Sequence, residues 1–106
     1  MNKPTIYNKL VRDNILAVIR NNGGTSKSHI ADDAEYWEKL KEKLVEEAEE
    51  FARDETASEL ADLQEVMAAI ITFKKFDNGE IDKIRADKNI KRGAFTKRII
   101  LEESTN

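Results

Sequence analysis

Apolar residues recur at steps of three and four along residues 37–51 and again along residues 60–70. This spacing is the period of an α-helix that buries one face. Thr56 stands three residues before Glu59, the pattern of a capping box that starts a helix. Two or three residues remain for the loop, so the pattern predicts two antiparallel neighbouring helices within residues 43–71. The predicted stripes are Trp37, Leu40, Leu44, Ala48 and Phe51, then Leu60, Leu63, Met67 and Ile70.

The rest of the chain predicts two further helices. Apolar spacing predicts one over residues 9–22, stopped by Gly23-Gly24, and another over residues 80–92, ended by Gly93. Residues 99–101 form a short apolar, strand-like segment that is expected to pack on the body. The predicted fold class is therefore all-α: one domain, residues 1–106, with about four helices around a central antiparallel helical hairpin.

The two predicted hairpin helices each carry two acidic residues three positions apart, at the edge of the apolar stripe. In a hairpin centred between residues 54 and 55, Glu50 lies level with Glu59, and Glu47 lies level with Asp62. Four carboxylates this close repel one another, and partial burial increases the repulsion. A bound cation removes that cost, and all-carboxylate ligation suits Mg²⁺, Mn²⁺ or Ca²⁺. The pattern therefore indicates a metal site.

A solvated acidic face is the alternative interpretation, because glutamate favours helices and most glutamates lie on surfaces. For Glu42, Glu46 and Glu49 taken singly, this alternative is preferred.

Trp37 lies on the predicted apolar stripe, so core packing is favoured over stacking on a nucleobase.

Charge is distributed unevenly along the chain. Residues 1–31 carry five basic and one acidic side chain, residues 32–65 carry four and fourteen, and residues 66–106 carry nine and six. A nucleic-acid binder presents a broader positive surface, so that class is disfavoured. A site that holds a metal and a polyphosphate needs both signs of charge close together. The chain has no cysteine, no apolar run of transmembrane length and no visible signal peptide, so we expect no disulfide, no membrane partner and a cytoplasmic location.

Three segments resemble one protein family. Residues 46–50 and 59–62, Glu-Glu-x-x-Glu followed by Glu-x-x-Asp, resemble the EExxE…ExxD signature of the MazG-like, all-α nucleoside triphosphate pyrophosphohydrolases. Residues 7–15, YNKLVRDNI, are similar to the opening of the branch related to phosphoribosyl-ATP pyrophosphohydrolase, and residues 91–95, KRGAF, resemble its closing segment. The resemblance implies hydrolysis of a nucleoside triphosphate or related nucleotide to monophosphate and pyrophosphate, a house-cleaning activity on the nucleotide pool.

The resemblance also implies roles for individual residues. Mg²⁺, with Mn²⁺ as a substitute, is expected to neutralise the phosphates and activate a water. Glu46 and Glu47 are the catalytic candidates, with Glu46 either holding a second metal or acting as a base. The implied metal ligands are Glu47, Glu50, Glu59 and Asp62, and the implied phosphate ligands are Lys9, Arg12, Lys88 and Arg92.

The candidate phosphate ligands also have interpretations without a functional role, and the chain as a whole has rival functions. For Arg12, a phosphate contact and a surface position, alone or paired with Asp13, carry equal weight. Lys88 and Arg92 are alternatively a solvated basic face near a helix C-terminus. Residues 66–73 are apolar on more than one side, so a homodimer or a higher homo-oligomer is expected. The rival functions are a non-catalytic helical interaction module and a protein that binds nucleotide and metal without turnover.

Overall fold

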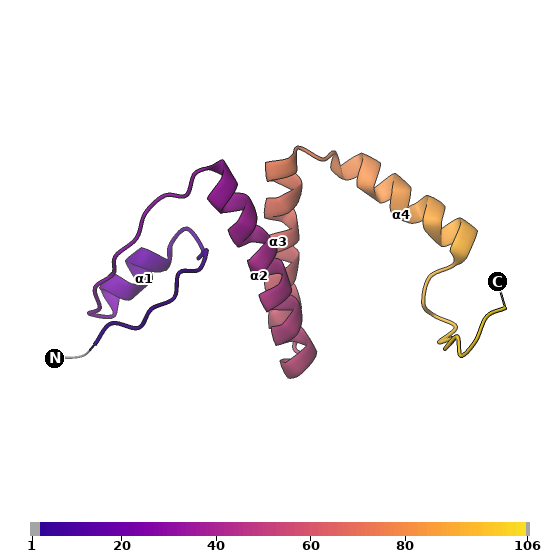
Figure 1. Cartoon of the computed structure of the whole chain (residues 1–106), viewed down its shortest axis with the longest axis horizontal. Coiled ribbons are helices and arrows are strands. Elements are labelled where there is room, and N and C mark those ends of the chain that lie inside the picture. The colour runs from indigo at the N-terminus through magenta and orange to yellow at the C-terminus, as the bar shows by residue number, and fades with distance from the viewer. Residues whose placement is uncertain (1–2, 106) are drawn as a thin grey trace.

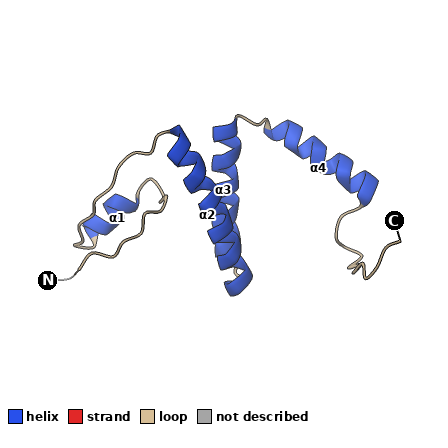
Figure 2. Ribbon diagram, in the orientation of Figure 1, coloured by secondary structure: helices blue, strands red, loops and turns tan. Residues whose placement is uncertain are grey.

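The fold is known from a computed structural model that describes residues 3–105, and within that range it consists of four α-helices without a β-strand (Figure 1, Figure 2). The all-α prediction is therefore confirmed. The helices are α1, Ile15–Asn21; α2, Asp33–Asp54; α3, Ala57–Lys74; and α4, Asn78–Arg92. No helix among the described residues combines the length and the apolar character needed to cross a membrane.

Side-chain caps define where α2, α3 and α4 begin. The backbone N–H of Glu35 donates to Asp32 Oδ1 at 2.9 Å, and the N–H of Glu59 donates to Thr56 Oγ1 at 3.2 Å. Asp77 accepts from the N–H of Glu80 in the same way, at 3.2 Å. Each cap satisfies a backbone donor that the first helical turn leaves free. The start signal that the sequence shows at Thr56 is therefore the one the structure uses.

The helices α2 and α3 form the body of the molecule. Glu55, in the left-handed conformation with φ 53°, ends α2, and α3 begins two residues later. So short a connection turns the chain back, and the two helices pack side by side along their length (Figure 1). We call these two helices and their connection the central pair.

The interior of the central pair is small. Leu40 is 1% exposed and Val66 is 9% exposed. At the open end of the pair, the Phe73 ring stacks on Trp37 with centroids 5.8 Å apart and meets Tyr36 edge-on at 5.1 Å. Trp37 therefore packs against α3, as its place on the apolar stripe predicts.

The packed face of α3 differs from the predicted stripe. Val66, which the stripe left out, is buried, whereas Leu60 and Met67 are 42% and 48% exposed. Leu63 and Ile70 are half-buried as expected. Because α3 is apolar on several sides, its sequence fits more than one face to α2, and the face that packs carries buried Val66 and the Phe73 ring.

The predicted first helix is too long. Residues 9–14 lie outside α1, which begins only at Ile15. Asp13 and Asn14 precede it, and such residues favour turns and helix starts over helix interiors because their side chains compete for backbone hydrogen bonds. The two cations of this segment, Lys9 and Arg12, form ion pairs with α2 and α3.

The molecule is elongated. Its radius of gyration is 18.9 Å and its longest dimension 62 Å, whereas a compact domain of this length has a radius of about 13 Å. The segment with α1 and the arm formed by α4 and the C-terminal residues leave the central pair on opposite sides (Figure 1). Residues 99–101 are not a strand and do not pack on the body: Ile99, Ile100 and Leu101 are 78%, 83% and 76% exposed. That prediction is wrong for the isolated chain, which leaves these side chains nothing to pack against.

Candidate metal centre

Glu47 is the exceptional residue of the central pair. It lies on α2 between the turns that carry Lys43 and Phe51, on the side that faces α3, and it is only 7% exposed. A carboxylate is almost never fully buried unless it is paired. Its burial identifies the place where the hydrophobic interface of the central pair becomes polar.

Two further carboxylates meet Glu47. Glu50 comes from the next turn of α2 and Glu59 from the first turn of α3, and both are half-buried. One oxygen from each of the three residues lies within 4.8 Å of the other two. We call these three residues the carboxylate trio. The short connection between the helices brings α2 and α3 into the register that makes this possible.

The trio leaves buried oxygens without a partner. Glu47 Oε2 and Glu59 Oε2 are both inaccessible to solvent and accept no hydrogen bond within the described residues. Glu47 Oε1 lies 3.4 Å from Lys43 Nζ, so one side of that carboxylate is compensated. An unsatisfied buried acceptor costs about 1–3 kcal/mol. A cation between α2 and α3 would satisfy both oxygens.

Titration behaviour follows from this crowding. Burial, and then the neighbouring Glu50 carboxyl, raise the pKa of Glu47 above its ordinary value, against the lowering effect of Lys43. Desolvation, and then the charges of Glu50, Asp54 and Asp62, raise the pKa of Glu59. Both shifts have the direction expected for crowded, partly buried carboxylates.

Glu46 is paired outside the trio. Its Oε1 accepts a hydrogen bond from Lys9 Nζ at 2.8 Å, and its Oε2 lies 3.9 Å from Lys43 Nζ. The hydrogen bond from Lys9 lowers the pKa of Glu46 despite partial burial, and it raises the pKa of Lys9. Glu46 is half-buried and ion-paired, whereas Glu49 is exposed as expected.

Asp62 also stands beside the trio rather than in it. Arg12 Nη2 donates to Asp62 Oδ1 at 2.8 Å, across 50 positions of sequence. Asp62 is close enough to Glu59 for its charge to raise the pKa of that residue. Of the four carboxylates predicted to converge, the structure gathers three, and it places the fourth against a cation.

Lys43 was not among the residues that sequence reasoning selected. Its ammonium approaches both Glu46 and Glu47, at 3.9 Å and 3.4 Å. The signal was present in the sequence, because Lys43 stands three and four positions before these residues, and such positions share a helix face. Lys43 contributes one positive charge to the edge of the trio.

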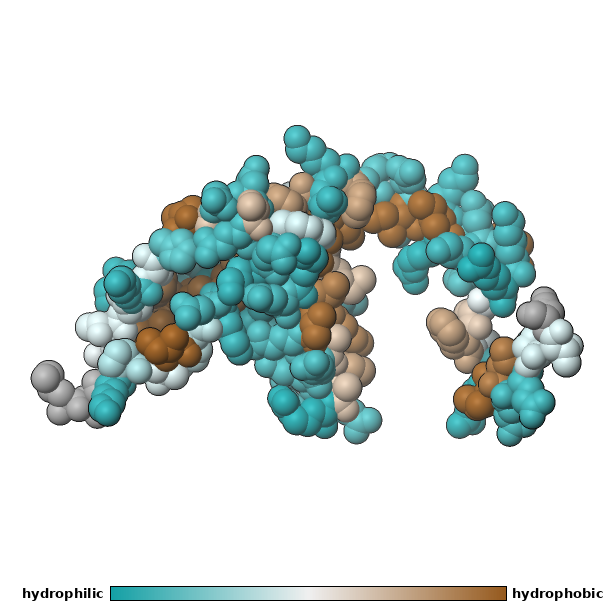
Figure 3. All heavy atoms as spheres, in the orientation of Figure 1, coloured by the Kyte–Doolittle hydropathy of each residue, from teal (hydrophilic) through white to brown (hydrophobic). Residues whose placement is uncertain are grey.

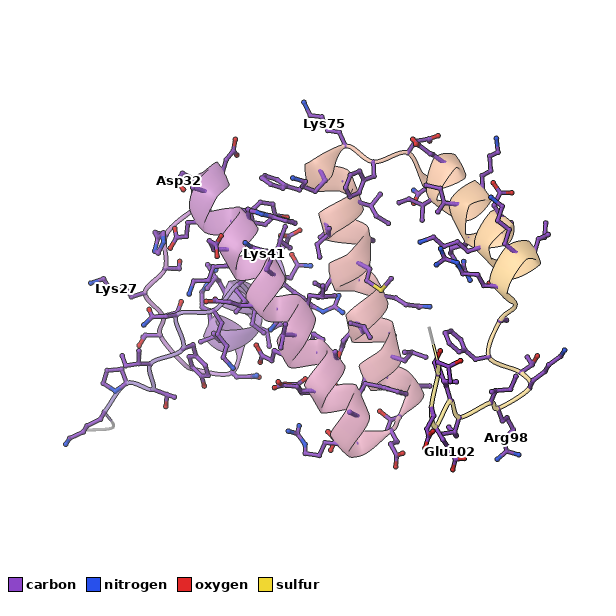
Figure 4. The ribbon with its side chains drawn as sticks, turned by 45° about the vertical axis from the view of Figure 1, so that its right-hand side comes forward. Lys27, Asp32, Lys41, Lys75, Arg98 and Glu102 are labelled. Carbon is purple, nitrogen blue, oxygen red and sulfur yellow. The ribbon has the colours of Figure 1, made fainter. Side chains whose placement is uncertain are left out.

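The two candidate phosphate ligands on α4 are not brought to the trio. Lys88 and Arg92 lie on the arm that leads away from the central pair, and α4 packs against neither α2 nor α1 within residues 3–105 (Figure 4). A phosphate clamp that faces the carboxylates is therefore not formed within one chain.

Comparison with known proteins adds no relative to this picture: no family model matches the chain, and neither the curated proteins nor the solved structures include a significant match.

Proposed function

We propose that this chain is a divalent-cation-dependent, MazG-like nucleotide pyrophosphohydrolase that converts a nucleoside triphosphate or related nucleotide to monophosphate and pyrophosphate. The observation that carries the proposal is Glu47. It is more than nine-tenths buried, one of its oxygens has no partner, and that oxygen lies at a three-carboxylate cluster.

The donor set of the trio fits a hard cation. Glu47, Glu50 and Glu59 offer only carboxylate oxygens, the donors preferred by Mg²⁺ and Mn²⁺, and no cysteine is available to favour zinc. Asp62 stands on the next turn of α3 after Glu59 and is available as a fourth ligand once Arg12 leaves it. A divalent cation held here would supply charge neutralisation for phosphates and lower the pKa of a water.

The chain's own residues contribute the rest of the chemistry. Glu46 is ionised, since Lys9 lowers its pKa, and it is adjacent to Glu47 on α2. An ionised carboxylate beside the reacting phosphate can accept a proton from the attacking water. Lys9 and Arg12 lie beside the same group of carboxylates, paired with Glu46 and Asp62. Their positive charges can offset the negative charge of a bound polyphosphate.

A second copy of the chain is part of this proposal. Apolar side chains gather on the arm formed by α4 and the C-terminal residues, where Phe95 is 97% and Ile90 82% exposed (Figure 3). An open groove of about 350 Å³ between α2 and α3 is lined by Tyr36, Ala69 and Phe73 among others. Surfaces of this kind are rare on stable monomers. We propose a homodimer or larger homo-oligomer in which the arm of one copy packs on the central pair of another.

The dimer would also account for Lys88 and Arg92. They are exposed near the end of α4, on the arm that would cross to the partner. In that arrangement two cations would reach the neighbourhood of a carboxylate trio from the other copy. Lys88 and Arg92 of one copy would then bind the phosphates held at the trio of the other copy, which is the role that the resemblance implies for them.

The decisive experiment is product analysis on a panel of nucleotides with and without Mg²⁺. We expect pyrophosphate and the monophosphate in Mg²⁺, and neither in chelator. Release of orthophosphate from the γ position, or full turnover in chelator, would overturn the proposal. Binding of Mg²⁺ and nucleotide without any product would favour the rival function, a nucleotide-binding protein without turnover.

A further inference from the structure

The N-terminal segment, residues 3–14, is held to the central pair by charge. It contains no helix, and its side chains are exposed except for half-buried Leu10. Within the described residues, two side-chain hydrogen bonds join this segment to the central pair: Lys9 to Glu46 and Arg12 to Asp62, both at 2.8 Å. One contact is to α2 and the other to α3.

The spacing of the two cations matches the spacing of the two helices. Lys9 and Arg12 are three residues apart, so the extended chain between them spans at most about 10 Å. Packed helices lie about 8–10 Å apart. The segment therefore crosses from one helix to the other at the height of the trio, since Glu46 adjoins Glu47 and Asp62 follows Glu59 by one turn.

The two cations compete with a divalent ion for the same electrostatic site. Glu47 and Glu50 as well as Glu46 contribute to the attraction that Lys9 experiences. A divalent ion in the trio would add two positive charges and weaken this attraction, and a metal drawn to Asp62 would meet the Arg12 charge that already lies at Asp62 Oδ1. Both partners of each ion pair are partly exposed, so the pairs are weak enough to exchange.

We infer that Lys9 and Arg12 are resident counter-ions of the carboxylate cluster, which a divalent cation displaces and which then bind the polyphosphate that accompanies it. This inference rests on the proposed function and deepens it: the segment is an exchangeable strap across the site. The alternative is a permanent structural tie, in which the same ion pairs persist in the presence of metal.

Affinity measurements separate the strap from the tie. The test variant carries Lys9→Gln and Arg12→Gln, and the control carries Arg20→Gln and Lys27→Gln, which remove the same charge from residues with no ion pair in the described range. Calorimetry measures the affinity for Mg²⁺ alone and then for pyrophosphate in saturating Mg²⁺.

The strap predicts opposite changes in the two affinities. Loss of two exposed competing ion pairs should tighten Mg²⁺ binding about fivefold in the test variant relative to the control. Loss of two phosphate ligands should weaken pyrophosphate binding by about tenfold or more. Weaker Mg²⁺ binding in the test variant, or pyrophosphate affinities equal to the control, would overturn the inference.

A probe on the strap reports displacement directly. The chain has no cysteine and one tryptophan, so Thr5→Cys accepts a single fluorophore, and energy transfer from Trp37 together with anisotropy follows the segment. We expect Mg²⁺ to release the label, pyrophosphate with Mg²⁺ to immobilise it again, and Glu47→Gln to abolish both responses. Mg²⁺ binding with no change in label mobility would establish the permanent tie and leave the proposed function standing, whereas absence of Mg²⁺ binding would overturn both.

Discussion

Replacing Glu47 by Gln removes one negative charge from the trio while it preserves the shape of the side chain. In the absence of metal, Glu47 is buried with one unpartnered oxygen, and oxygens of Glu50 and Glu59 lie within 4.8 Å of one of its own. We therefore expect Glu47→Gln to be at least as stable as the parent in chelator. The same variant should lose activity and most of the stabilisation that Mg²⁺ gives the parent.

The size of the effect follows from the geometry. Two unit charges 4.8 Å apart, the upper limit of the separations in the trio, repel by about 2–3.5 kcal/mol at an effective dielectric constant of about 20–40. Glu47 has two such neighbours, and Lys43 at 3.4 Å offsets about one of them. The gain on neutralising Glu47 is thus about 1–3 kcal/mol, which corresponds to about 5–15 °C in melting temperature for a domain of this size.

The pH dependence has a definite sign. The folded pKa of Glu47 lies above its ordinary value of 4.5, so the folded state binds more protons than the unfolded state between these two values. Glu47 therefore destabilises the fold above that window, and the cost disappears as the pH falls through it. The stability advantage of Glu47→Gln should be largest at neutral pH and vanish near pH 4.5.

Thermal melts in chelator and in Mg²⁺ measure these quantities. Mg²⁺ at about 100 times its dissociation constant should stabilise the parent by about 2.7 kcal/mol, because it binds only the folded state. Glu49→Gln, on the exposed side of the same helix, is the matched control and should respond to Mg²⁺ as the parent does. Equal Mg²⁺ responses in all three proteins, or a Glu47→Gln variant that melts well below the parent in chelator, would refute the reasoning.

Three further expectations follow from the same observations. Sedimentation at micromolar concentration should give a dimer or larger species, because one chain buries little more than Leu40 and Val66; a compact, stable monomer would contradict this. Lys9→Gln should destabilise the parent at neutral pH, and urea unfolding should show the difference vanish in acid: the lowered pKa of Glu46 means that its stabilising effect is present above pH 4.5 and is lost as the pH falls through the folded value. If the difference persisted at pH 2, the ion pair would not be its cause. Hydrolysis should be restored to a chelated sample by Mg²⁺ or Mn²⁺, and a colorimetric assay that finds equal turnover without any metal would exclude the assigned role of the trio.

The sequence determined the helices of the central pair, because their signals are local. Capping at Asp32 and Thr56, and the steps of three and four between apolar residues, depend on neighbours within one or two turns. Local spacing also placed Glu47 and Glu50 on one side of α2 and Glu59 at the start of α3. A short connection then left few ways to align them, so the meeting of the trio was predictable from the sequence.

Tertiary structure decided what local patterns left open. The sequence of α3 fits several faces to α2, and only the packed structure showed that the buried face carries Val66 and the Phe73 ring. The structure begins α1 at Ile15, and the two cations that precede it, Lys9 and Arg12, are held by α2 and α3. Those ion pairs span 37 and 50 positions of the chain. The spacing of apolar residues along the sequence does not predict such contacts. They arise from charge attraction between segments that are distant in sequence and that only the fold brings together.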